Sequence, residues 1–351
     1  MSKLFEGKRI LVTGGTGSLG QVLTKRLLSG VDGLPENVTV FSRDEAKQHY
    51  MRLDFMENST ATDEVIFQNS QQRLRFKIGD VRDFHSVVDS LRDIDIVFSA
   101  AALKQVPSCE YAPWEAVRTN VQGAENLVRA ISEYRLPIET VVGISTDKAC
   151  KPVNVMGMTK AIQERVFIQG NLRAPETRFI AARYGNVLAS RGSVVPLFLD
   201  QIAAGGPVTI TTTEMTRFLL TLDDAVDTIF AAVAAAQPGD TYIPRCPAAY
   251  MTDLAEFLID GRDIEMVVTG IRPGEKIHES LLSEEESTRT VFGDGACYAL
   301  RPMLPELAGP VTEPALVGEF SSDTAIMNKE ELAVFLKKRI PEVIGQRYLE
   351  S

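Results

Sequence analysis

Short apolar runs alternate with amphipathic segments along the first half of the chain. Runs rich in Val, Ile, Leu and Phe occur at 9–12, 38–41, 74–78, 94–99, 140–145 and 179–184. Such runs are typical of strands that are buried on both faces of a parallel sheet. Helical spacing follows at 18–28, 44–56, 113–133 and 154–171. The alternation predicts an α/β fold with a doubly wound parallel Rossmann sheet, which holds ligands at the carboxyl ends of its strands.

The regular alternation weakens after residue 186, where Gly and Pro punctuate shorter elements. We therefore expect a Rossmann core over 1–185, with further sheet elements from about 215–245, the run 241–243 among them. Residues 186–214 and 246–351 are expected mainly to form a smaller, interleaved substrate-binding subdomain and a C-terminal tail. The polar stretch 56–72 is typical of a loop or a helix end.

The charge balance narrows the choice of partners. The chain has a formal net charge of −10 and no Lys/Arg-rich block, which argues against nucleic acid and anionic membranes as partners. An anionic small ligand would need basic residues gathered locally. The scattered cysteines and histidines show no ligand spacing, so we expect no metal site and no disulfide framework. No apolar stretch is long enough to cross a bilayer, and we expect a cytoplasmic protein.

A glycine-rich turn follows the first predicted strand. Gly14, Gly17 and Gly20 form a G-x-x-G-x-x-G spacing that opens the first predicted helix. Such glycines allow a tight turn, close approach of the backbone to a pyrophosphate and close helix–strand packing. The alternative is a glycine-rich turn without a ligand. In its strand–helix context the motif predicts dinucleotide binding by the three glycines together with Thr16, Ser18 and Leu19.

The end of the second predicted strand bears on which dinucleotide binds. Enzymes that use NAD place an acidic residue there, whereas this chain has Ser42 followed by Arg43, with Lys47 nearby. A guanidinium suits a 2′-phosphate, so the pattern favours NADP over NAD. Two alternatives stay open: Arg43 is a solvated surface charge, or Asp44 turns toward the ribose. Asp80 and Val81, after the third strand, either meet the adenine or simply end that strand.

Acid–base groups gather in the stretch from Ser145 to Lys160. A hydroxyl, a carboxylate and an ammonium stand side by side at Thr146, Asp147 and Lys148, directly after a predicted strand. Lys160 follows in the next predicted helix, and Met156 lies one helical turn before it. Neighbouring acid and base groups at the mouth of a parallel sheet indicate proton-transfer chemistry. The alternative for Asp147 and Lys148 is a surface ion pair.

These features resemble the extended short-chain dehydrogenase/reductase family. More closely, the chain resembles the soluble UDP-N-acetylglucosamine 4,6-dehydratases that open pseudaminic-acid, legionaminic-acid and capsular FucNAc pathways. The resemblance covers roughly residues 5–300 and rests on seven stretches in the same order: 42–45, 100–107, 119–124, 145–148, 183–192, 215–218 and 272–276. It also implies that Ala100 and Ala101 contact the cofactor.

The resemblance implies a role for each group. Lys148 would remove the sugar's C5 proton, and Asp147 would protonate the departing C6 hydroxyl. Thr146 would bind the C4 oxygen, and Lys160 would hold the nicotinamide ribose. A lysine base must be neutral, so we expect the pKa of Lys148 to be lowered, by desolvation or by nearby positive charge.

Two positions depart from the family pattern. Ser99 stands where many relatives carry histidine, and Met156 stands where most carry the active-site tyrosine. The proton of the C4 hydroxyl then passes to Asp147, or to a water through Thr146. Met156 is either part of the active site, where a thioether would lower the local dielectric, or part of the helix core.

Positive charge for a UDP-sugar has candidates in the second half of the chain. The resemblance places Arg217 and Arg272 near the diphosphate and Lys104 near the sugar. Further groove residues are Asn186, Arg191 and Glu275. For each, a solvated surface position is the alternative. Asn120 either joins a water relay or ties strand to helix, and His278 is expected to be structural.

Three functions compete at this point. The first is a UDP-N-acetylglucosamine 4,6-dehydratase, with or without inversion at C5. The second is a sugar-nucleotide 4-epimerase, which has no use for the second acid–base pair at 147 and 148. The third is a catalytically silent NADP-binding regulator, suggested by the missing tyrosine. The resemblance further implies a homo-oligomer, either a dimer or a hexamer.

Overall fold

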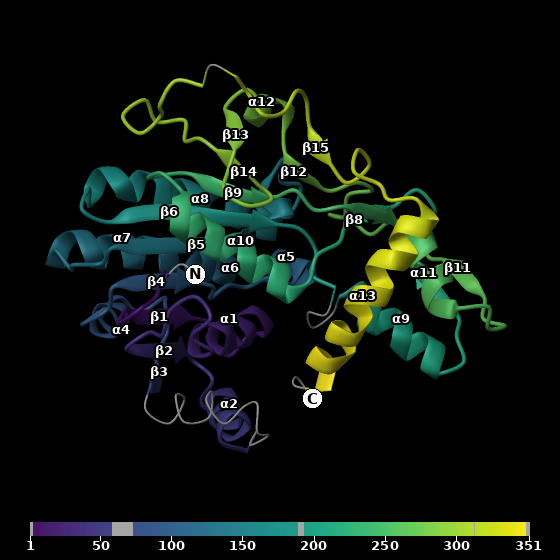
Figure 1. Ribbon diagram of the computed structural model, residues 1–351, viewed down its shortest axis with the longest axis horizontal. Helices are drawn as coiled ribbons and strands as arrows, with labels where there is room; N and C mark the ends of the chain where they lie inside the picture. The colour runs from purple at the N-terminus through teal and green to yellow at the C-terminus, as the bar shows by residue number, and fades with distance from the viewer. Residues whose placement is uncertain (1–2, 58–72, 189–192, 312, 349–351) are drawn as a thin grey trace.

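Parallel strands run across the centre of the molecule in the computed structural model, which describes residues 3–57, 73–188, 193–311 and 313–348 (Figure 1). The nine-stranded sheet has the order β13-β14-β9-β6-β5-β4-β1-β2-β3. Its strands are β1 (Arg9–Thr13), β2 (Asn37–Ser42), β3 (Leu74–Ile78), β4 (Ile96–Ser99), β5 (Thr140–Thr146), β6 (Arg178–Tyr184), β9 (Thr241–Pro244), β13 (Thr290–Phe292) and β14 (Cys297–Leu300). From β9 to β3 all pairings are parallel, and β14 and β13 add antiparallel pairs at one edge.

Helices cover both faces of this sheet because its strands are apolar on both sides. On β1, Ile10 and Val12 belong to the core under α1 and α10, whereas Leu11 belongs to the core under α4, α7 and α8. The helices of the core are α1 (Ser18–Leu28), α2 (Glu45–Glu57), α4 (Phe84–Ser90), α5 (Val106–Tyr111), α6 (Pro113–Ala116), α7 (Gly123–Tyr134), α8 (Val155–Arg173) and α10 (Leu222–Ala235). Alternate residues of a strand face opposite sides, which produces the two cores.

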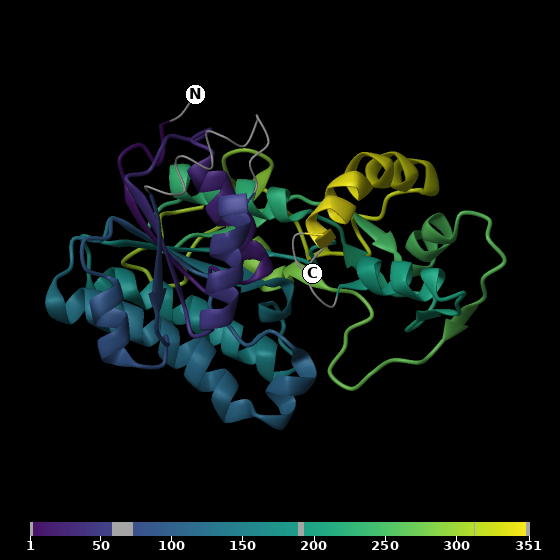
Figure 2. The same cartoon turned by 90° about the horizontal axis from the view of Figure 1, so that it is seen from below.

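A smaller body with its own apolar core lies beside the carboxyl end of the sheet (Figure 2). It consists of the helices α9 (Val194–Ala203), α11 (Met251–Ile259) and α13 (Lys329–Tyr348), and of paired strands β7 (Val208–Ile210) with β11 (Met266–Val268) and β8 (Thr216–Phe218) with β10 (Ala248–Tyr250). A third pair, β12 (Ser280–Leu282) with β15 (Phe320–Ser321), and helix α12 (Glu284–Ser287) connect it to the main sheet.

The predicted fold class is confirmed, and several boundaries differ. The helix predicted over 113–133 is divided into α6, a π-helical segment at Val117–Gln122, and α7. The predicted strand at 241–243 is β9 of the main sheet. Strands β13 and β14 also join that sheet, although they fall in the range expected mainly to form the substrate-binding subdomain. Most of the polar stretch 56–72 lies outside the described residues.

The order of strands places a switch point between β1 and β4. Strand β1 pairs with β2 on one side and with β4 on the other. The connection after β1 therefore runs toward one edge of the sheet, and the connection after β4 runs toward the opposite edge. In parallel sheets ligands bind in the crevice that opens outside such a point.

Candidate active site

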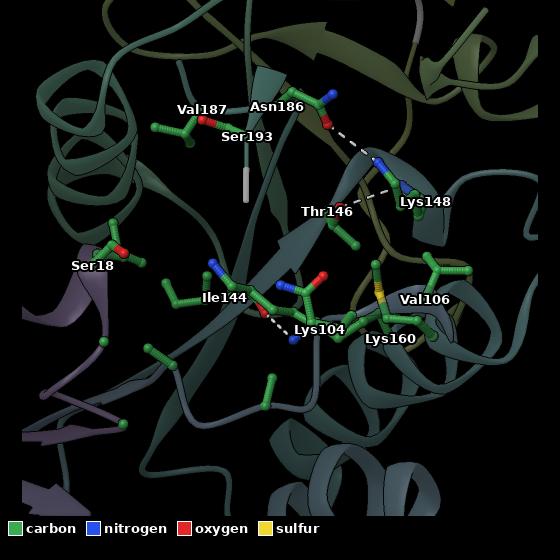
Figure 3. A pocket seen from close by; sticks show the side chains of 18 of the residues that line it. Ser18, Lys104, Val106, Ile144, Thr146, Lys148, Lys160, Asn186, Val187 and Ser193 are labelled. Atoms are coloured by element: carbon green, nitrogen blue, oxygen red, sulfur yellow. Dashed lines mark hydrogen bonds between the residues drawn. The ribbon is translucent and has the colours of Figure 1, made fainter. Parts of the chain in front are cut away.

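A cavity of about 910 Å³ opens at this switch point, between the sheet and the smaller body. The loops after β1, β2, β3, β4, β5 and β6 line one side of it, and residues of α9, β7, β8 and the 269–275 loop line the other. Figure 3 shows side chains from these separate segments around the cavity, with Ser18 at one end and Lys148 at the other. One continuous space therefore joins the glycine-rich loop to the acid–base stretch.

The glycine-rich loop fits a pyrophosphate. Gly14 has a positive φ of 67°, and a Cβ there would lie 2.7 Å from the backbone of Ala101, so only glycine is tolerated. Helix α1 starts at Ser18 and has no acidic residue in its first turn. Its N-cap residue is Gly17, so no side chain caps the first N–H groups. Its first N–H groups and the positive end of its dipole are thus available to an anion. Gly17, Gly20, Thr16 and Leu19 also line the cavity.

Cationic side chains mark the end of the cavity beside β2. Arg43 and Lys47 both line it, and the side chain of Arg43 is half exposed and 3.7 Å from Asp80. Asp44 accepts from the backbone N–H of Lys47 and pairs with its ammonium, so the carboxylate is engaged within its own helix. The buried Ser42 accepts a hydrogen bond from a neighbouring glutamine. This donor set suits a 2′-phosphate better than a bare ribose diol.

The residues after β3 border the same end of the cavity as Arg43. Asp80 and Val81 line the cavity. Burial alone would raise the pKa of Asp80, but hydrogen bonds from Arg82 lower it below its usual value. After β4, Ala101 donates its N–H to the Thr13 hydroxyl, and Ala100 lines the cavity beside it.

The acid–base stretch forms a 3₁₀ turn, Asp147–Ala149, at the end of β5. Thr146 donates its hydroxyl hydrogen to Asp147 Oδ1 over 2.8 Å, and Lys148 Nζ lies 3.1 Å from the same oxygen. The first turn of α8 presses against this turn: a Cβ on Gly157 would come within 2.2 Å of the Lys148 carbonyl oxygen. Close packing therefore fixes the direction of the turn, and Thr146 and Lys148 line the cavity while Asp147 is buried behind them.

Three oxygens surround the Lys148 ammonium. It donates to Asp147 Oδ1, and it donates over 3.2 Å to Asn186 Oδ1, a bond that Figure 3 marks. It also pairs with Glu279 Oε1 at 3.2 Å. Burial lowers its pKa, but the charges of Asp147 and Glu279 outweigh burial, so the pKa is raised. The expectation of a lowered Lys148 pKa is wrong for this arrangement, because sequence reasoning did not place a second carboxylate beside the ammonium.

The lysine with a lowered pKa is Lys160. Its ammonium is buried in α8 and donates to the Ile144 carbonyl and to Gln163 Oε1. Desolvation lowers its pKa to about 8. Lys160 lines the cavity next to the end of β5 (Figure 3), the place expected for the nicotinamide ribose.

Met156 lines the cavity and also belongs to a small apolar cluster. It is 5% exposed and packs with Cys109 and Ala116, whereas Met158 is 48% exposed. Met156 was expected to lie either in the active site or in the helix core. Its side chain does both, because it belongs to an apolar cluster that borders the cavity.

Asn120 is engaged in structural hydrogen bonds. Its Oδ1 accepts from the Leu103 N–H, and its Nδ2 donates to the Leu103 carbonyl and to Thr159 Oγ1. The side chain is buried and ties the segment after β4 to α8. The structure supports the alternative in which Asn120 connects these segments.

The predicted substrate residues lie on both sides of the cavity. Arg217 is buried and donates to the backbone carbonyls of Thr216, Lys276 and Ile277. Arg272 is exposed, with its guanidinium 3.9 Å from Glu275. Of the other predicted substrate residues, Lys104, Asn186 and Glu275 also line the cavity, whereas Arg191 lies outside the described residues.

The loop that carries Arg272 is hydrogen-bonded to the start of α8. Asn154 caps α8 by accepting from the Gly157 N–H, and its Nδ2 donates to the Gly274 carbonyl over 2.9 Å. His278 lies beside this loop with Nδ1 2.8 Å from Thr216 Oγ1, a contact consistent with a structural role.

The charge of the lining runs against that of the whole chain. Despite the net charge of −10, more cationic than anionic side chains line the cavity. The cations are Arg43, Lys47, Lys104, Lys148, Lys160, Arg217 and Arg272, and the carboxylates are Asp44, Asp80, Glu275 and Glu279. A local excess of positive charge favours an anionic ligand such as a nucleotide.

Sequence reasoning missed Glu279. It is 2% exposed, lines the cavity, and lies just before β12, far along the chain from Lys148. Its only sequence signal is its position after the Arg272–Lys276 stretch. No spacing rule connects it to the 3₁₀ turn.

Comparison with known proteins agrees with this geometry. The model of a family described as polysaccharide biosynthesis protein matches residues 10–299. The chain belongs to this family. It is 43% identical over 291 residues to a protein named UDP-glucose 4-epimerase from Rickettsia conorii, covering 82% of this chain and 81% of that protein.

Two solved structures resemble the fold. Pen from Bacillus thuringiensis matches with a TM-score of 0.82 and 33% identity, covering 95% of this chain and 99% of that chain. A dTDP-glucose 4,6-dehydratase from Streptomyces venezuelae, solved with NAD, matches with a TM-score of 0.63 and 22% identity over 77% of this chain and 86% of its own. The second likeness shows the fold alone.

The residues that the structure describes contain no group of three or more His, Cys, Asp or Glu arranged to hold a metal ion. None of their helices combines the length and the apolar character needed to cross a bilayer.

Proposed function

We propose that this chain catalyses the NADP-dependent 4,6-dehydration of a UDP-N-acetylhexosamine, as a lyase of surface-glycan or nonulosonic acid biosynthesis. The observation that carries the proposal is the turn that sets Thr146 and Lys148 on the cavity next to Lys160, with Asp147 in hydrogen-bond contact with both. We also propose that residues 1–185 bind the cofactor, that 186–214 and 246–351 contribute most of the substrate site, and that the protein is cytoplasmic and homo-oligomeric.

NADP would lie along the crevice, with its pyrophosphate on the Gly14–Gly20 loop and its 2′-phosphate near Arg43 and Lys47. When bound, NADP would supply hydride transfer from C4 of the sugar and back to C6. Lys160 would hydrogen-bond the nicotinamide ribose. Arg217 and Arg272 would meet the UDP diphosphate from the opposite wall of the cavity.

The protons are handled by the 3₁₀ turn. Thr146 binds the C4 oxygen and passes its proton to Asp147, which its hydroxyl already contacts. The C4 ketone acidifies the C5 proton, which Lys148 removes as the free amine. Asp147 then protonates the C6 hydroxyl, which leaves as water, and Lys148 returns a proton to C5 as C6 receives the hydride. One base and one acid on adjacent carbons are what a redox-neutral dehydration requires.

A sugar-nucleotide 4-epimerase is the second candidate, and the name of the Rickettsia relative favours it. Epimerisation needs hydride removal and return at C4 only. The acid–base pair at 147 and 148 would then have no step to perform, and for this reason we place dehydration first.

The mass of the product separates the two reactions. Incubation with UDP-N-acetylglucosamine and NADP should give a product lighter by one water, and a D₂O experiment with ring couplings reads the C5 configuration. An isomer of unchanged mass would establish the epimerase, and no turnover with any UDP-hexosamine would contradict both.

Lys148→Ala should lower dehydration by about 10²–10⁴-fold, the range for a lost general base. NADP binding, measured by calorimetry, should stay unchanged. Lys151→Ala is the matched control, since Lys151 lies nearby, is exposed and pairs with Glu319. A fully active Lys148→Ala enzyme would remove this lysine from the mechanism.

A further inference from the structure

Two carboxylates share one ammonium at the end of the cavity. Lys148 Nζ lies 3.1 Å from Asp147 Oδ1 and 3.2 Å from Glu279 Oε1, and both carboxylates are almost fully buried. Two negative charges beside one positive charge are costly in a buried site unless one carboxyl keeps a proton. The question is which of the two takes it.

The contacts distinguish the carboxylates. Asp147 Oδ1 accepts from both Thr146 and Lys148. The side chain of Glu279 pairs with Lys148. Each carboxylate also has one buried oxygen without a hydrogen-bond partner in the described residues, Asp147 Oδ2 and Glu279 Oε2. The other oxygen of Asp147 accepts two hydrogen bonds, whereas that of Glu279 meets Lys148, so protonation of Glu279 disturbs fewer favourable contacts.

The charges that face Glu279 agree with this assignment. Burial and the neighbouring Asp147 raise its pKa, against the opposing effects of Lys148, Arg217 and Lys276. Glu279 also lines the cavity, so a bound substrate would exclude more water from it.

We propose that Glu279 is a positioning residue that takes a proton from Lys148 and thereby prepares the free amine. The inference rests on the proposed dehydration. An N–H bond of the Lys148 ammonium breaks and an O–H bond forms on Glu279 Oε1, with no net change in charge. The ion pair becomes a neutral amine and a neutral acid, a form that a desolvated site favours. The amine then accepts the C5 proton, and Asp147 stays free to protonate the C6 hydroxyl.

This step resolves the conflict between a raised Lys148 pKa and a lysine base. Lys148 need not lose its proton to solvent, because a proton acceptor lies within hydrogen-bond distance. The active pair carries a single transferable proton, so activity requires that the doubly protonated pair loses one. The acidic limb of the pH profile should therefore report on Glu279, at a pH above the usual carboxyl value of about 4.3.

The test compares Glu279→Gln with wild type and with Glu284→Gln, the same change at an exposed position of α12. Glutamine keeps the shape and an acceptor oxygen but takes no proton. With UDP-N-acetylglucosamine, the rate of water loss should fall about 10²-fold or more while KM changes less than about threefold. Reduced nicotinamide and the 4-keto sugar should accumulate, because C4 oxidation precedes C5 deprotonation. The acidic limb of the pH profile should vanish in Glu279→Gln. Glu279→Asp, which keeps a carboxyl group, should restore part of the rate.

Equal rates and pH profiles in wild type and Glu279→Gln would overturn the inference. A variant with a higher KM, a lower kcat and an unchanged pH profile would also overturn the inference, because structural damage gives that result.

A second measurement is independent of turnover. NMR titration of ¹³C-methylated lysines should show the pKa of Lys148 falling by at least about one unit in Glu279→Gln, because a negative neighbour is lost. An unchanged Lys148 pKa would refute the pairing whatever the reaction is. If wild type yields no dehydrated product while the pKa shift is present, the proposed function fails and the pairing stands.

Discussion

At the scale of single residues, the site depends on how burial and neighbouring charge set proton affinity. Lys148 and Lys160 both line the cavity, yet their pKa values shift in opposite directions. Lys148 faces two carboxylates, whereas Lys160 faces a carbonyl and an amide oxygen. Residue type alone does not distinguish an ammonium from a potential base; the set of partners does.

Met156 offers a direct test of the missing phenol. Met156→Tyr would place a hydroxyl one helical turn from Lys160, whose positive charge lowers the pKa of a nearby phenol. We expect the rate of C4 oxidation, measured by nicotinamide absorbance, to rise about tenfold at neutral pH. Met156→Phe has the same bulk and should not show the gain, and both variants should lose a similar ~1–3 kcal/mol of stability from overpacking. Equal rates in the two variants would mean that no proton acceptor is missing.

Arg43 should decide the cofactor. Arg43→Ala removes a guanidinium that lines the cavity beside Lys47, and a lost charged hydrogen bond costs about 1.5–3 kcal/mol. NADP should bind about 10- to 100-fold more weakly, and NAD should bind as before, as measured by calorimetry. Arg92→Ala is the control, because Arg92 is exposed and does not line the cavity. A similar loss for both cofactors would argue against a 2′-phosphate contact.

At the scale of elements, a buried ion network links the Rossmann core to the segment that carries Glu279. Arg183 on β6 is 1% exposed and pairs with Glu164 on α8 and Glu286 on α12. Because α12 follows β12 directly, this network fixes the segment that starts at Glu279 against α8. A buried guanidinium without its carboxylates would be strongly destabilising.

The network should make stability depend on acidity. Burial would raise the pKa of Glu286, but Arg183 overrides it and lowers the pKa to about 2. A lowered folded-state pKa gives stability that is present above the unfolded value and is lost as the pH falls from about 4.3 toward 2. Glu286→Gln should lower the free energy of unfolding at pH ~7 by about 3 kcal/mol and flatten this dependence, as measured by urea unfolding.

Glutamine at 286 keeps an acceptor for the Ser283 cap, so the effect should report on the charge. Glu284→Gln, in the same helix, should change the free energy of unfolding by less than about 0.5 kcal/mol. An unchanged acid dependence in Glu286→Gln would show that other carboxylates govern acid unfolding.

At the scale of the whole molecule, the cavity depends on two bodies. The Rossmann sheet provides the glycine-rich loop and the 3₁₀ turn, and the smaller body provides Arg217 and the wall formed by α9 and β7. Each has its own apolar core, and Figure 2 shows the two bodies beside each other. The hydrogen bond from Asn154 to Gly274 joins them at the mouth of the site.

Ligands should therefore protect different bodies from hydrogen exchange. UDP should slow exchange in 194–217 and 266–279 by about tenfold, because it bridges the walls and orders both. NADP alone should slow exchange mainly in 14–21 and 42–48. The measurement is exchange mass spectrometry with each ligand added separately. Protection by UDP confined to the Rossmann core would contradict the placement of the diphosphate.

The sequence by itself determined what short-range patterns encode. The apolar runs predicted the strands of the Rossmann core because burial on both faces requires such runs. The phosphate loop was predictable because all its glycines lie within one strand–turn–helix unit. The same holds for the 146–148 turn and for Lys160, which neighbouring elements bring together.

Tertiary structure alone decided which distant groups meet. Glu279 reaches Lys148 because β12 passes beside the turn after β5, and β13 and β14 extend the sheet through pairings that no local pattern specifies. The directions of the Lys148 and Lys160 pKa shifts follow from these contacts. Proton affinity in a buried site depends on every charge within a few ångströms, and folding sets those distances between residues far apart in the chain.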